Sequence, residues 1–225
     1  MNISHEHKVV WWAPDKIDNI VFPTIFSQYN FQYKDKKEIK NVEFPNYSRE
    51  MNLPDTYLDY TLICNIKNPY KIVYSIYHKH NTTTYTKKNK SHFRDNFIKY
   101  VNYIFLPYKL KVKLDSYSET EPLTKYYSSY SFEKKIPNFF IREEKIKEDL
   151  QLIKFVDFEK IWDDKFLIKN LNSESFFDEM YDFETAKKVY FYFKKCFYLC
   201  GYDPFSFTKN ELTYDEKVSF LHDVI

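Results

Sequence analysis

Residues 60–66 (YTLICNI) pass directly into residues 67–70 (KNPY), and this stretch decides the fold that we predict. A short apolar run that ends at a turn is typical of a strand buried in a parallel sheet. Pro69 suits the first turn of a helix, where the missing N–H has no partner to lose. We therefore expect a helix from residue 69 to about residue 80, directly after the strand.

The same alternation of strand and helix continues on both sides of this stretch. Residues 8–13 (KVVWWA) and 138–142 (NFFIR) are two further apolar runs with the length of short strands. Helical spacing of apolar residues predicts helices over 93–105, 145–153 and 183–201, and Gly201 supplies a C-terminal cap. Strands that alternate with helices indicate an α/β fold with three layers, α/β/α, around a central parallel sheet. We expect one domain over residues 1–225.

Composition narrows the class of protein. The 225 residues include 34 basic and 32 acidic ones, for a net charge of +2, so no strong field favours nucleic acid as a partner. The sequence contains no apolar window long enough for a membrane span, and its N-terminus does not resemble a signal peptide, so we expect a cytoplasmic protein. Gly201 is the only glycine, which excludes the GxGxxG, Walker A and kinase glycine-rich loops.

Cysteine and histidine patterns give no metal site. The chain has three cysteines and no CxxC pair, which indicates buried free thiols in a reducing compartment. These cysteines are Cys64, Cys196 and Cys200. The histidine pairs in residues 5–7 and 78–80 have no Cys or carboxylate set to complete a tetrahedral site, so we expect no metal cofactor.

Two strand-to-helix turns carry lysines at the place where α/β sheets bind ligands. Lys16 follows the strand of residues 8–13, and Lys67 follows the strand of residues 60–66. Ser75 lies on the helix after the second turn. Free N–H groups at helix N-termini attract anions, and ligands bind at the carboxyl ends of parallel strands. The two turns together predict a phosphate or sulfate site.

Four stretches in order along the chain resemble motifs of the sulfotransferases that use 3'-phosphoadenosine-5'-phosphosulfate (PAPS), in particular the carbohydrate-type and membrane-type branch. The stretches are residues 8–16 (KVVWWAPDK), 67–75 (KNPYKIVYS), 140–150 (FIREEKIKEDL) and 189–203. The resemblance covers most of the chain. It implies a fold like that of the P-loop nucleotide hydrolases, PAPS as cosubstrate without a metal, and a carbohydrate or another hydroxyl compound as acceptor.

The resemblance also implies roles for individual residues. Lys16 matches the lysine that binds the 5'-phosphosulfate and helps the bridging oxygen to leave, and Asn19 lies in the same cosubstrate-binding loop. Lys67 and Ser75 match the basic residue and the serine that hold the 3'-phosphate. The family's general base is a Glu or His between these two motifs, and Glu50, in the loop of residues 33–56, is the nearest match.

Departures from the family pattern leave a second function open. The loop after Lys16 has Ile17 and Asp18 where the family has small or hydroxyl residues. Lys67 is at a position where the family usually has an arginine. A lysine keeps the charge but loses the bidentate fork of a guanidinium. The alternative is therefore a catalytically inactive binding or structural protein with the sulfotransferase fold. A P-loop protein related to nucleotide kinases is a third reading, which the missing Walker motif disfavours.

Overall fold

The computed structural model describes residues 2–12, 29, 32–33, 55–81, 90–105, 136–157 and 179–222. The chain divides into two compact units, each made of two stretches. Unit 1 comprises Met1–Lys67 and Lys125–Glu174, and unit 2 comprises Asn68–Thr124 and Ser175–Ile225. The single domain over residues 1–225 stays a prediction.

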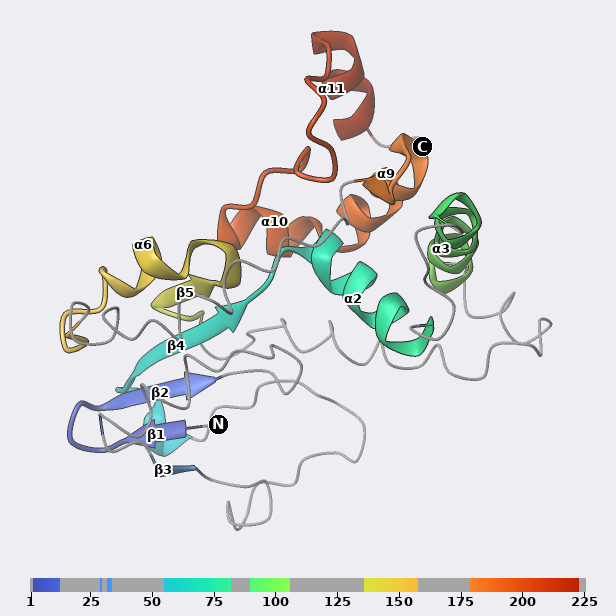
Figure 1. The fold of residues 1–225 in the computed structure, drawn as a ribbon. Helices are drawn as coiled ribbons and strands as arrows, with labels where there is room; N and C mark the ends of the chain where they lie inside the picture. Colours follow the sequence, from blue (N-terminus) through green and yellow to red (C-terminus); the bar gives the residue numbers. More distant parts are fainter. Residues whose placement is uncertain are drawn as a thin grey trace. The chain divides into compact units, whose positions relative to one another are not determined.

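Unit 1 is built on a sheet in which the strands follow the order β3-β1-β2-β4-β5 (Figure 1). The strands are β1 (Asn2–Ser4), β2 (Val9–Trp12), β3 (Gln32–Tyr33), β4 (Thr61–Ile66) and β5 (Phe139–Arg142). The three strands predicted from apolar runs are thereby confirmed as β2, β4 and β5. They lie side by side at one end of the sheet, and β2 and β5 both run parallel to β4.

The sheet as a whole is mixed, so the prediction of a central parallel sheet is confirmed for β2, β4 and β5 alone. β1 runs antiparallel to both β2 and β3. The reason is a tight turn between β1 and β2, in which Lys8 has a φ of 50° and its amide bonds to the carbonyl of His5. A non-glycine residue in this left-handed region is uncommon and marks a sharp reversal of the chain.

Both faces of this sheet are covered by apolar side chains. One face carries a buried cluster that continues into the residues after β5. Its members are Val9, Trp11, Ile63, Ile141, Ile146, Leu150, Ile153 and Val156. The other face buries Ile3, Val10 and Leu62 against Tyr57 and Tyr60. Tyr57 belongs to the short 3-10 turn η1 (Asp55–Tyr57). Alternation of buried residues between the faces follows the two-residue period of a strand.

The helix predicted over residues 145–153 is shorter than expected. After β5 the chain forms the 3-10 turn η5 (Glu143–Lys145) and then α6 (Ile146–Leu150). Beyond Leu150 the amides bond three residues back, from Leu152 to Asp149 and from Ile153 to Leu150. Such bonds tighten the chain into turns and end the α-helix.

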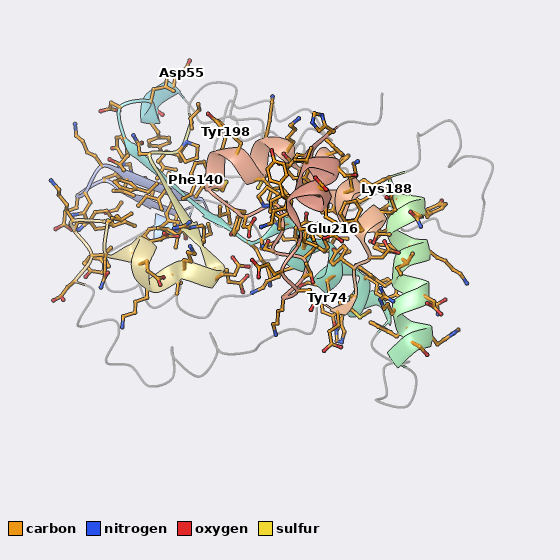
Figure 2. All side chains as sticks on the ribbon, turned by 90° about the horizontal axis from the view of Figure 1, so that it is seen from above. Asp55, Tyr74, Phe140, Lys188, Tyr198 and Glu216 are labelled. Carbon is orange, nitrogen blue, oxygen red and sulfur yellow. The ribbon has the colours of Figure 1, made fainter. Side chains whose placement is uncertain are left out.

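Unit 2 is helical, and its helices are α2 (Pro69–Asn81), α3 (Lys90–Ile104), α9 (Phe183–Tyr192), α10 (Lys194–Cys200) and α11 (Tyr214–Leu221). The helices predicted over 69–80 and 93–105 are confirmed as α2 and α3. Tyr77 of α2 packs on Phe93 and Phe97 of α3, with ring centroids 5.0 and 5.3 Å apart. Lys188 of α9, which is labelled in Figure 2, donates to Asn102 Oδ1 of α3 at 2.6 Å. Aromatic contacts therefore fill much of this core.

The helix predicted over residues 183–201 is interrupted, which corrects that prediction. Phe193 leaves the helical backbone region, with φ −103° and ψ 17°, and separates α9 from α10. The buried positions keep helical spacing across the break, so the predicted core face was right. Gly201 ends α10 in the left-handed conformation with a φ of 65°, as the cap prediction requires.

The predicted state of the cysteines is confirmed. All three are buried and none of them forms a disulfide, and the sulfur atoms of Cys196 and Cys200 lie 3.9 Å apart on α10. Among the described residues, no helix is long and apolar enough to cross a membrane.

Candidate functional site

The candidate site lies where β2, β4 and β5 end. The register pairs Trp12 with Cys64 and Ile66 with Arg142, so the three parallel strands finish at the same edge of the sheet. We call this the carboxyl edge: the last residues of the three strands and the residues that follow β4 and β5. Ligands of open α/β sheets bind outside such an edge.

An ion pair joins the two strand ends. Because Ile66 pairs with Arg142, the residues that directly follow the two strands, Lys67 and Glu143, come together. Lys67 Nζ lies 3.0 Å from Glu143 Oε2, and the two side chains are only 20% and 21% exposed. The atoms are close enough for an ion pair, but their alignment is not that of a hydrogen bond. The cation predicted from the sequence is therefore at the carboxyl edge and faces a carboxylate.

A second pair of opposite charges fixes the end of β5. The backbone N–H and Nε of Arg142 donate to Asp149 Oδ2 at 2.8 and 2.9 Å, and Nη2 donates to Oδ1. Asp149 is 3% exposed. Bidentate pairs of this kind are directional as well as strong. The guanidinium ties β5 to α6 and is already bound to a carboxylate within unit 1.

A buried amide, that of Asn65, lies near the same edge on β4, the middle one of the three parallel strands. Trp11 Nε1 donates to Asn65 Oδ1 at 2.7 Å, and both residues are 0% exposed. Trp11 belongs to the buried apolar cluster on one face of the sheet. The other amide atom, Asn65 Nδ2, has no hydrogen-bond partner among the residues that the structure describes. A buried donor in this state costs about 1–3 kcal/mol.

The structure describes two of the five predicted site residues. Lys16, Asn19 and Glu50 lie outside the described residues. Lys67 belongs to unit 1, at the carboxyl edge, and Ser75 lies on α2 of unit 2. The Ser75 hydroxyl donates to the backbone carbonyl of Lys71 at 2.6 Å. Before this hydroxyl could donate to a phosphate, it would have to break that bond.

The NPY part of the KNPY motif is an anchor within unit 2. Asn68 Oδ1 accepts from the Tyr70 N–H at 2.9 Å at the start of α2, and its Nδ2 donates to Ser206 Oγ at 2.8 Å. The Tyr70 hydroxyl donates to the carbonyl of Pro204 at 2.6 Å. Burial, followed by the charges of Asp203 and Tyr190, raises the pKa of Tyr70 well above its usual value, so this phenol stays a donor. The motif fixes the start of α2 to the segment after α10.

Sequence reasoning missed the carboxylates of unit 1 that face cations. Glu143 directly follows β5 as Lys67 directly follows β4, but only the pairing of β4 with β5 brings the two residues together. Asp149 was read as part of a motif, without a partner. Among the described residues, no three His, Cys, Asp or Glu side chains gather as a metal site would require.

No family model, curated protein or solved structure matches this chain.

Proposed function

We propose that this protein is a sulfotransferase that uses PAPS as the sulfuryl donor and a carbohydrate hydroxyl as the acceptor. The proposal includes the three-layer fold related to P-loop nucleotide hydrolases. The observation that carries it is the position of Lys67 at the carboxyl edge, directly after β4, which pairs with β2. The segment that contains Lys16 follows β2 directly in the sequence. The order of strands and lysines is thus the one that the motif resemblance requires.

The proposed reaction is an in-line transfer. The acceptor oxygen attacks the sulfur, and the bond between sulfur and the bridging oxygen of the 5'-phosphate breaks. The electron pair of that bond leaves with the phosphate, so the products are a sulfate ester and 3',5'-adenosine diphosphate. Glu50 takes the hydroxyl proton as general base. Lys16 stabilises the negative charge that develops on the leaving phosphate.

The remaining predicted residues bind the nucleotide. Asn19 donates to the phosphosulfate from the loop after β2, while Lys67 and Ser75 bind the 3'-phosphate. For Lys67 this requires a change of partner, since its ammonium faces Glu143. For Ser75 it requires a new rotamer, since its hydroxyl donates to the Lys71 carbonyl.

These two contacts favour the alternative function as well. In an inactive protein with this fold, the ion pair and the serine bond would simply be structural. The protein would then bind a partner or a nucleotide without chemistry. The two functions differ in whether sulfuryl transfer occurs and in whether it depends on Lys16.

A transfer assay separates the two functions. The full chain is incubated with PAPS labelled at sulfur and a panel of polysaccharides and oligosaccharides, and labelled product is counted for wild type, Lys16→Ala and Lys154→Ala. We expect transfer by wild type and a loss of at least about a hundredfold in Lys16→Ala, because a cation at the leaving group acts in the transition state. Lys154, an exposed lysine of unit 1, is the matched control and should keep wild-type activity.

Equal transfer by wild type and Lys16→Ala would contradict the assigned role of Lys16. Absence of transfer to every acceptor, together with retained binding of 3',5'-adenosine diphosphate, would favour the inactive alternative.

A further inference from the structure

The charges at the carboxyl edge are balanced in pairs. Among the described residues of this edge, Arg142 is bound to Asp149 and Lys67 faces Glu143. Neither cation therefore presents an unopposed positive charge to a ligand. A phosphate that approaches Lys67 meets a carboxylate at 3.0 Å from the same ammonium. The phosphate and the carboxylate are both negative, and they repel each other strongly because the site is mostly shielded from water.

The two carboxylates contact their cations in different ways. Asp149 accepts three hydrogen bonds from Arg142 and is 3% exposed. Glu143 reaches Lys67 through contact without hydrogen-bond alignment, and its side chain is 21% exposed. Its backbone lies in the 3-10 turn η5, directly after the residue that Asp149 clamps. Glu143 is therefore the carboxylate that a phosphate at Lys67 would displace from the ammonium.

We infer that Glu143 sets the affinity of the phosphate subsite at Lys67 by occupying the ammonium in the absence of ligand. Binding then exchanges one anion for another: the 3'-phosphate replaces the carboxylate of Glu143. The inference rests on the proposed function, in which Lys67 binds the 3'-phosphate of the nucleotide. It adds a residue that determines both affinity and the preference for a 3'-phosphate.

If the 3'-phosphate replaces the Glu143 carboxylate, removal of that carboxylate should raise the affinity only for nucleotides with a 3'-phosphate. Replacing Glu143 by glutamine removes the competing charge and keeps the size of the side chain. Affinity for 3',5'-adenosine diphosphate should rise about fivefold, the value of one partly screened charge pair. Affinity for 5'-adenosine monophosphate, which lacks the 3'-phosphate, should change less than about twofold. In Lys67→Ala/Glu143→Gln the gain should disappear.

The measurement is calorimetric titration of the full chain with the two nucleotides, after circular dichroism has shown that each variant folds. Glu144→Gln is the matched control, because Glu144 is the exposed neighbour on the same turn and its replacement changes the net charge equally. This control should bind both nucleotides as wild type does.

Each outcome decides the matter. A Lys67-dependent gain in Glu143→Gln supports the inference, even where wild type shows no measurable binding. Unchanged or weaker binding by Glu143→Gln, with a wild type that binds, overturns the inference and leaves the proposed function standing; Glu143 would then position Lys67. Equal gains in Glu143→Gln and Glu144→Gln overturn it as a general charge effect. No binding by any variant overturns both the inference and the proposed function.

Discussion

Arg142→Ala is expected to lower the free energy of unfolding by about 3 kcal/mol, because removal of one partner strands the buried carboxylate of Asp149. Asp149 is 3% exposed and would lose the two side-chain donors of Arg142, Nε and Nη2, while the bond from the backbone N–H remains. The change should also loosen η5, and with it the position of Glu143. The effect belongs to unit 1, which contains both residues.

Tryptophan fluorescence during urea unfolding measures this effect, because it reports on unit 1. All three tryptophans, Trp11, Trp12 and Trp162, fall within the stretches of unit 1. Arg142→Lys keeps the charge but lacks the bidentate fork of the guanidinium, so its loss in free energy of unfolding should lie between those of wild type and Arg142→Ala. Lys147→Ala, an exposed position on α6, is the control. If Arg142→Ala is as stable as the Lys147→Ala control, the contact between Arg142 and Asp149 contributes little to the stability of the fold.

Tyr70→Ala should be the most damaging single change in unit 2, with a loss of about 4 kcal/mol, as is usual when a large buried aromatic is truncated. Tyr70 is 0% exposed, and its ring contacts Tyr181, Phe197 and Phe207 at centroid distances of 5.1–5.7 Å. Tyr70→Phe keeps the ring and removes only the bond to the Pro204 carbonyl. It should therefore cost about 1 kcal/mol.

The pH dependence of the Tyr70→Phe effect adds a second readout. Burial raises the pKa of the Tyr70 phenol above that of the unfolded chain. The folded state therefore holds this proton more tightly, and its contribution to stability is complete below the unfolded pKa and is lost as the pH rises above it. Stability of wild type should fall above about pH 10, and Tyr70→Phe should fall less steeply. Thermal unfolding followed by circular dichroism at neutral and alkaline pH measures the stability of both proteins. An equal loss of stability with pH in wild type and Tyr70→Phe would contradict the raised pKa of Tyr70.

Local sequence signals predicted the elements that local physics determines. The apolar run of residues 60–66 became β4, and α2 starts at Pro69, where Asn68 caps it through the Tyr70 N–H. β1 was not predicted, because three residues carry no period and because its pairing depends on the unusual backbone of Lys8. α11 was also missed, although Thr213 and Glu216 form a capping box with a readable sequence spacing.

Only those features of the site that depend on the order of residues along the chain could be predicted from the sequence. Lys67 follows a strand, so its position at the carboxyl edge could be expected. Its partner could not, because Glu143 is distant in sequence and arrives through the pairing of β4 with β5. The bond from Ser75 to the Lys71 carbonyl is a rotamer choice within a helix, which residue order does not specify.

Binding of 3',5'-adenosine diphosphate, measured as a shift in melting temperature, tests the central claim most directly. The claim predicts a saturable rise in wild type and in Lys154→Ala, and its loss in both Lys16→Ala and Lys67→Ala. At a nucleotide concentration of about 100 times Kd the stabilisation is about 2.7 kcal/mol, which corresponds to roughly 5–10 °C for a chain of this size. No rise at millimolar nucleotide, or the same rise in all four proteins, would contradict the claim.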